Sequence, residues 1–265
     1  MKVHLTAVFA VAALAAGVGF EVRAQQSPAK EPLVFEIASI KPTPAEERRG
    51  IVHQLPGGQT YEAIGAPLRM IMTVAYTVTD RQITGGPDWI NTDRWNIEAK
   101  ADRRSTSDEL HDALARLLED RFQLKLRRET RELPAYLLVV DKKGSKMPVH
   151  DAADLVHEPI AGQFQEGVLN MTGQNVAMNY FAFFLSRIMP LNVVDKTGLL
   201  EHYDVKMHYV PERRGPGDGG APPPPPADGL DLIMALREQL GLRLDKGTGP
   251  VEHLVIEHVD KPSGN

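Results

Sequence analysis

An order of hydrophobic patterns that occurs twice along the 265-residue chain constrains the fold most strongly. Alternation of apolar and polar residues, typical of a half-buried strand, marks residues 95–100 and again residues 203–209. After each stretch come an apolar helical stripe and a short strand, at residues 110–126 and 232–244. A chain that repeats its order of elements in this way is expected to fold as two similar α+β halves.

The register of the repeat can be counted. Leu118 and Leu236 differ by 118 positions, whereas Trp95 and Tyr203 differ by 108. The offset between the two copies grows by ten residues, from 108 to 118, because a Pro- and Gly-rich segment at 211–229 lengthens the second copy. This segment is expected to form a mobile, partly polyproline loop.

We therefore predict an α+β fold of two tandem β-α-β-β-α-β-β repeats, each a small sheet packed with two helices. The first repeat covers residues 33–150 and the second covers residues 151–265. The alternative is a chance similarity, because any two series of short strands and helices look alike.

The N-terminus has the pattern of a secretory signal peptide over residues 1–24. A basic residue, Lys2, precedes an apolar run of about 16 residues, and the pattern Val22-x-Ala24 suits signal peptidase. The run is shorter than the ~20 residues of a spanning helix, which disfavours the alternative of an uncleaved anchor. Residues 25–32 are then a solvated leader, and we expect a periplasmic or secreted protein with no membrane span after cleavage.

Composition excludes several function classes. The chain contains no cysteine, so disulfides, thiol catalysis, cysteine-based metal sites and a lipoprotein anchor are excluded. Its 30 basic and 35 acidic residues are mixed along the chain and give a net charge of −5. We expect no nucleic-acid partner, because binding nucleic acid usually needs a basic face.

Motifs of catalysis and cofactor binding are missing from the sequence. There is no Gly-x-Ser-x-Gly elbow, His-Glu-x-x-His helix, phosphate-binding glycine loop or dinucleotide fingerprint. His150, Asp151, Asp154 and His157 form the densest group of possible metal ligands, but their spacing matches no known site, and a solvated linker is the simpler interpretation. The sequence predicts no catalytic residue, no metal and no cofactor.

The helix expected from Asn175, as its N-cap, through Ile188 is the feature that most suggests a partner. Phe181 lies on its main apolar face, whereas Phe183 points nearly opposite, with Tyr180 beside it. A helix that is apolar all round is buried on two sides or exposes a contact patch. Tyr180 and Phe183 are therefore candidate partner contacts, and packing between the two repeats is the alternative.

The second half resembles the short N-terminal domain of secretins and TonB-dependent transducers. The residues that carry this resemblance are 192–198, 203–209, 235–244 and 254–256. It implies a small α+β fold that acts through protein contacts without a cofactor.

Nearly the full chain after the predicted signal peptide is also similar to a secreted family that is numerous in soil bacteria and is carried as a domain of unknown function. Some members of that family are attached to a BlaR1-like membrane sensor peptidase. The similar segments are 35–42, 56–58, 85–89, 118–122, 128–129, 134–136, 194–198 and 261–263. This resemblance implies an exported location and the architecture described above.

Two hypotheses for function follow from these patterns. The first is a non-enzymatic binding or protein-interaction module whose partner is an envelope or secreted protein. The alternative is an extracytoplasmic hydrolase of unrecognised type, which the absence of known motifs does not exclude.

Overall fold

The computed structural model describes residues 31–262, apart from positions 45, 48 and 56 and the segments 152–157 and 212–229. The predicted signal peptide 1–24, most of the leader 25–32 and nearly all of the loop at 211–229 lie outside the described residues. From Pro32 onward the chain forms one compact unit. Its helices and sheets confirm the expected α+β class.

We call β1 to β6 the first half and β7 to β11 the second half. The first half contains β1 (Phe35–Pro42), β2 (Ile51–Gln54), β3 (Thr60–Pro67), α1 (Leu68–Ala75), the 3-10 turn η1 (Asp80–Gln82), β4 (Ile83–Gly85), α2 (Trp89–Thr92), β5 (Arg94–Ala101), α3 (Ser107–Arg121) and β6 (Lys125–Val140). The second half contains β7 (Glu158–Gln165), β8 (Val168–Val176), α4 (Met178–Ile188), β9 (Val193–Asp195), β10 (Tyr203–Tyr209), α5 (Leu232–Ala235), the π-helical turn η2 (Leu236–Leu240) and β11 (Leu242–His258).

Each half has an antiparallel sheet and an apolar core of its own. The first sheet has the order β1-β5-β3-β2, and α1 packs against both β3 and α3. The second sheet has the order β10-β8-β7, with η2 against β10. Phe122 is fully buried in the first core and Phe181 in the second.

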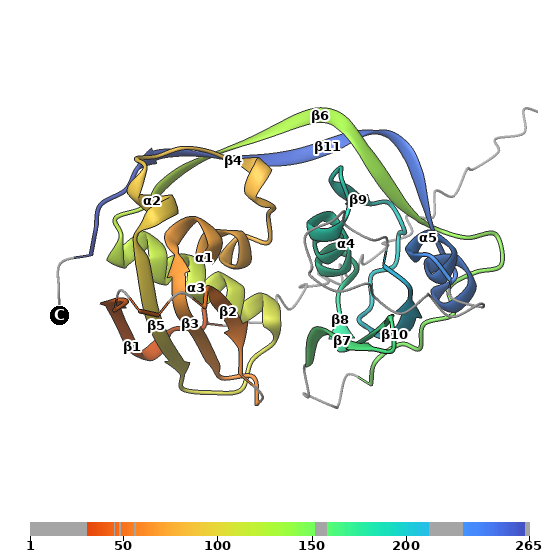
Figure 1. Cartoon of the computed structure of the whole chain (residues 1–265), viewed down its shortest axis with the longest axis horizontal. Coiled ribbons are helices and arrows are strands. Elements are labelled where there is room, and N and C mark those ends of the chain that lie inside the picture. The colour runs from red at the N-terminus through yellow and green to blue at the C-terminus, as the bar shows by residue number, and fades with distance from the viewer. Residues whose placement is uncertain are drawn as a thin grey trace, which may run out of the picture. The chain divides into compact units, whose positions relative to one another are not determined.

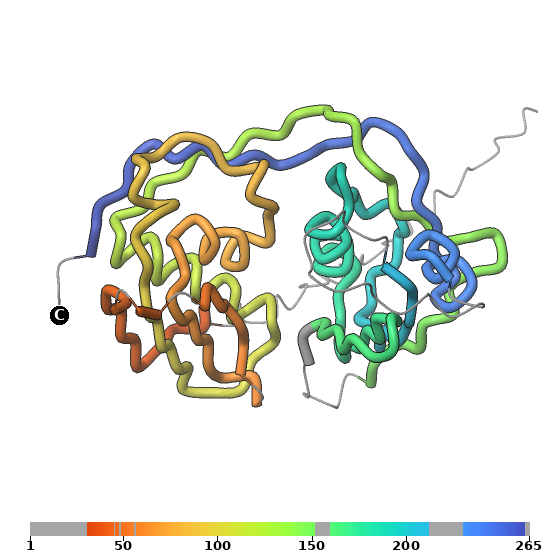
Figure 2. Tube along the Cα trace, viewed as in Figure 1, coloured from red at the N-terminus to blue at the C-terminus, as the bar shows by residue number. Residues whose placement is uncertain are grey.

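A third sheet joins the two halves, with the order β4-β11-β6-β9. Its centre is a long antiparallel ribbon of β6 and β11, which run side by side past both halves (Figures 1 and 2). β4 of the first half pairs in parallel with β11, and β9 of the second half pairs in parallel with β6. Each half therefore contributes its short strand to the long strand of the other.

This ribbon differs from the sequence prediction of a separate sheet in each repeat. The patterns at 122–126 and 135–140 indicate two short strands, but β6 is one strand of 16 residues. Likewise, β11 is one strand of 17 residues that covers both predicted segments. Their central residues, near the pair of Glu132 and Pro250, are polar or break the alternation. These residues belong to neither core, so the apolar pattern that marks a strand is missing there.

The central strand pairs in the antiparallel sheets of the two halves match in register. Ala63 faces Ile97 in the first sheet, and Gly173 faces Val205 in the second. Both ladders then shift at a bulge before the following helix. Gly65 has a φ of 59° in the first bulge, and Asn175 has a φ of 58° in the second.

The prediction that Asn175 caps α4 is wrong. The N-cap residue of this helix is Ala177, which makes no side-chain cap. Asn175 instead takes the left-handed conformation at the end of β8, one of the positions that Asn tolerates better than most residues.

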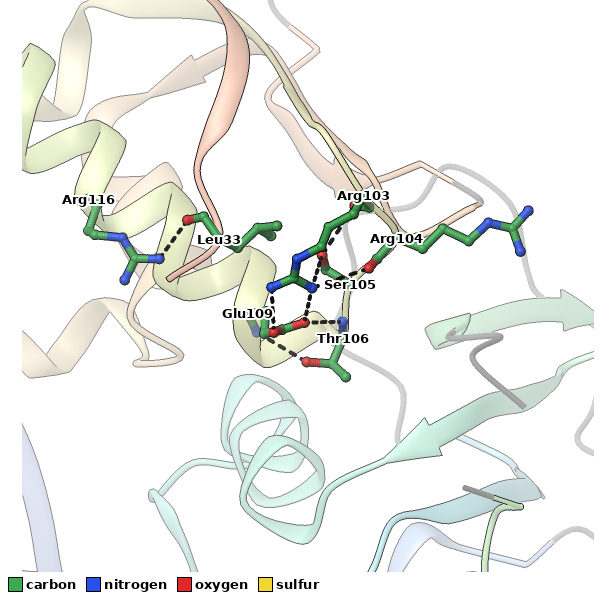
Figure 3. Close-up of polar contacts among 7 residues, drawn as sticks. All are labelled: Leu33, Arg103, Arg104, Ser105, Thr106, Glu109 and Arg116. Carbon is green, nitrogen blue, oxygen red and sulfur yellow. Dashed lines mark hydrogen bonds and ion pairs between the residues drawn. The ribbon is translucent and has the colours of Figure 1, made fainter. Parts of the chain in front are cut away.

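The sequence also predicts two helix ends, since Thr106 and Glu109 form a possible capping box and Gly241 stops the last helix, and both are confirmed. Thr106 and Glu109 form a reciprocal capping box at the start of α3 (Figure 3). Arg103 holds the same Glu109 carboxylate through two contacts of 3.0 and 3.2 Å. At the end of η2, Gly241 has a φ of 68°, and a Cβ there would lie 2.1 Å from the carbonyl oxygen of Gly144. Only glycine fits this turn.

The start of the described chain is tied to α3. The Arg116 guanidinium donates to the Leu33 carbonyl over 2.8 Å (Figure 3), and the Leu33 side chain is buried in the first core. Within the described residues, no helix has the length and apolar character needed to cross a membrane.

Candidate functional site

A cavity of about 520 Å³ lies between α1 and η1 of the first half and the C-terminal end of α4 of the second half. We call it the junction cavity. Pockets that bind small molecules measure about 300–1,000 Å³, so this one is large enough for a ligand. Its charged lining residues are Arg69, Asp80, Arg81 and Arg187. Its uncharged lining residues are Pro67, Met70, Thr73, Val78, Thr79, Asn91 and Ser186.

Arg69 is already neutralised by the protein. Its guanidinium forms an ion pair with the Asp80 carboxylate and donates to the carbonyl oxygens of Asp80 and Ile83 over 2.9 and 2.6 Å. The Arg69 side chain is only 20% exposed. These contacts fix the turn between α1 and β4, so Arg69 and Asp80 together add little net charge to the cavity.

Arg81 connects the two halves. Its Nη2 donates to the Ser186 carbonyl at the end of α4 over 2.8 Å, and its Nε donates to the Asn192 side-chain oxygen over 2.6 Å. Both acceptors are uncharged, so the positive charge is solvated by amide oxygens and not paired with a carboxylate. Partial burial lowers the pKa of Arg81, although a guanidinium stays protonated in proteins.

Arg187 is the third arginine and is exposed. It lies in the last turn of α4, with its guanidinium carbon 5.9 Å from the centre of the Phe183 ring. Among the described residues, its guanidinium has no ion pair or hydrogen bond. The cavity therefore has three cations and one carboxylate in its lining, and that carboxylate is paired with Arg69.

The opposite character is found on the α1 side of the cavity. Pro67 and Met70 contribute apolar surface there, and Thr73 donates its hydroxyl proton to the Met70 carbonyl over 2.7 Å. A cationic wall beside an apolar wall suits a small molecule with an anionic group and an apolar body. In the described part of the chain, no group of three or more His, Asp or Glu side chains is placed to hold a metal ion.

The predicted partner contacts do not line this cavity, and of the two Phe183 is buried and Tyr180 half-buried. Phe183 is only 7% exposed, and its ring centre lies 5.8 Å from that of Tyr180 in a tilted arrangement. Tyr180 also stacks on His111 of α3, with the ring centres 5.5 Å apart. Burial raises the pKa of the Tyr180 hydroxyl. These contacts favour the alternative of packing between the halves, while a partner role for either residue stays a prediction.

The group of possible metal ligands near residue 150 is not assembled in the described residues. His150 is buried and its Nδ1 lies 2.7 Å from a carboxylate oxygen of Asp204, which also accepts from the Asn175 backbone over 3.2 Å. Asp154 and His157 lie outside the described residues. The His150–Asp204 pair fixes the start of β10 next to the end of β8.

The sequence does not single out the three arginines of the junction cavity. Arg69 belongs to α1, Arg81 to η1 and Arg187 to α4, and no short motif connects them. They meet because the two halves pack against each other, which a local pattern does not encode. A cation without a neighbouring acidic residue, such as Arg187, is the only signal, and it is common on protein surfaces.

Fold and site define a small α+β protein with a cationic cavity between its halves. The family model described as "Protein of unknown function (DUF3738)" matches residues 69–259, and the chain belongs to this family. The matched region contains every lining residue of the junction cavity except Pro67. Neither the curated proteins nor the solved structures contain a match to the chain.

Proposed function

We propose that this protein is an exported, non-enzymatic binding module that holds its ligand or partner in the junction cavity. The observation that carries the proposal is a ligand-sized cavity with two arginines, Arg81 and Arg187, that no carboxylate of the described chain neutralises. A guanidinium without a carboxylate partner favours an anionic ligand over water, because the ligand adds charge-assisted hydrogen bonds.

Export is part of the proposal and rests on the N-terminal sequence. Residues 1–24 have the signal-peptide pattern, and a secreted family with BlaR1-like relatives would place the protein in the periplasm or outside the cell. The exported protein is then expected to begin at Gln25. An intact mass that includes Met1 would refute this part of the proposal.

We further infer that residues 33–150 and 151–265 arose by duplication. In support, Ile83 of β4 faces Leu254 of β11, and Val193 of β9 faces Tyr136 of β6. Tyr136 and Leu254 are 118 positions apart, the same offset that relates Leu118 to Leu236. The matching bulges near the ends of β3 and β8 also support the duplication. On this inference the junction cavity lies where two related halves meet, a common place for ligand sites.

A bulky side chain inside the cavity tests the proposed site. We expect Thr73→Trp to fill the cavity from α1 and abolish binding, while Leu200→Trp, at a position that is 93% exposed, leaves binding intact. Thermal unfolding with a panel of peptides, esters and glycans detects binding, because a ligand of the native state raises the unfolding midpoint.

The same panel separates binding from hydrolysis. For a binding module, the stabilising compound is recovered unchanged after incubation with the full chain. Recovery of hydrolysis products, with turnover lost on unfolding, would support the extracytoplasmic hydrolase instead. Equal binding by the Thr73→Trp and Leu200→Trp proteins would show that the junction cavity is not the site.

A further inference from the structure

We propose that the junction cavity recognises a short peptide or acyl compound through a free carboxylate, with Arg187 and Arg81 as the groups that bind it. This inference rests on the proposed function and specifies its ligand. It combines the charge of the cavity, the unused donors of the two arginines and the apolar wall beside them.

The charge of the cavity selects an anion. Asp80 neutralises Arg69, so the lining retains the charges of Arg81 and Arg187. A cationic ligand would meet two guanidinium groups that have no carboxylate partner, and like charges repel. The negative end of the α4 dipole would weaken anion binding, but Arg81 donates to the Ser186 carbonyl at that end and offsets it.

The two arginines offer complementary donors. A guanidinium has five N–H donors, and Arg81 uses one from Nε and one from Nη2 to hold Asn192 and Ser186. The remaining donors of Arg81 are held in a fixed direction by these two bonds. Arg187 keeps all of its donors available and is exposed, so it can turn toward an incoming ligand. The fixed guanidinium of Arg81 and the adjustable guanidinium of Arg187 could each donate to one of the two oxygens of a carboxylate.

The apolar wall favours a carboxylate with an organic body over a free inorganic anion. Met70 and Val78 line the cavity together with Pro67, and the volume of about 520 Å³ far exceeds that of phosphate. Apolar groups of the ligand would gain stability by covering this wall. The shared chemistry is that of an oxyanion, and the probes below separate a carboxylate on an apolar chain from phosphate.

The test uses N-acetyl-alanyl-leucine as the free acid, its C-terminal amide and inorganic phosphate as probes, titrated into the full chain by calorimetry. We expect the acid to bind at least about tenfold more tightly than the amide or phosphate, because a charge-assisted hydrogen bond contributes that much. Arg187→Gln should lower the affinity for the free acid about tenfold. Arg104→Gln, which removes the same charge at another exposed position outside the cavity, should bind within about twofold of the wild type.

Each other outcome overturns the proposal. If the acid and the amide bind equally well and Thr73→Trp abolishes the binding of both, the cavity binds ligands but does not recognise their carboxylate. If phosphate binds and the acid does not, the site is one for small oxyanions. If Arg187→Gln and Arg104→Gln behave alike, Arg187 takes no part. If no probe binds, the carboxylate recognition proposed here is wrong, while other compounds of the panel still test the binding module.

Discussion

Removal of the Phe183 ring tests whether the two halves pack together beside the junction cavity. The ring is 7% exposed and belongs to neither apolar core, and its neighbours are Tyr180 and Arg187. Replacing a buried Phe by Ala costs about 3–5 kcal/mol. We expect Phe183→Ala to fall at the low end, about 3 kcal/mol, because the exposed Arg187 side chain can move into part of the space.

Urea unfolding of the wild type and the variant measures this loss. For an m-value of about 3 kcal/mol/M, the midpoint should fall by about 1 M. The matched control is Phe164→Ala, whose ring is 68% exposed and whose loss should change stability by no more than about 0.5 kcal/mol. If Phe183→Ala is as stable as this control, the ring is not packed between the halves and the hypothesis of an exposed partner contact gains support.

Three further predictions follow from single positions. Gly241→Ala should lower the free energy of unfolding, measured in urea, by at least about 2 kcal/mol. The new Cβ would clash with the Gly144 carbonyl, and alanine disfavours the positive φ at this position. Gly198→Ala, with a φ of 69° and open space, should cost clearly less. Thr106→Ala should cost about 1 kcal/mol by removing the α3 cap. Burial holds the pKa of His253 below its usual value of 6.5, so His253 is protonated in the unfolded chain at a higher pH than in the folded protein. The free energy of unfolding should therefore fall as the pH drops below 6.5. His253→Leu should make the free energy of unfolding depend less on pH in this range.

Contrary results are equally specific. Equal costs for Gly241→Ala and Gly198→Ala would remove the steric reason for glycine at the end of η2. An unchanged stability of Thr106→Ala would mean that the capping box does not hold α3. If the wild type and the His253→Leu protein lose stability equally as the pH falls below 6.5, protonation of a group other than His253 causes that loss.

Local patterns in the sequence predicted much of the fold. The Thr106 capping box and the turn at Gly241 depend on residues close in sequence, and both are confirmed. Alternation of apolar residues likewise located β5 and β10, because one side of each strand faces a core.

Other features depend on partners that are distant in sequence. β4 and β9 have three residues each, too few for a periodic pattern, and each is positioned by a long strand of the other half. The sequence does not separate the two roles of Asn175, because residues that cap helices also tolerate a left-handed conformation. The cationic site could not be predicted because Arg81 and Arg187 are brought together only by packing between the halves.

The most direct measurement of the central claim follows the arginine side chains themselves. In a protein with ¹⁵N-labelled arginine, the Nε–Hε signals of Arg81 and Arg187 should shift in a saturable way as N-acetyl-alanyl-leucine is added. The signal of Arg104, outside the cavity, should stay in place. Unchanged Arg81 and Arg187 signals at a concentration that stabilises the protein would contradict the assignment of the junction cavity as the binding site.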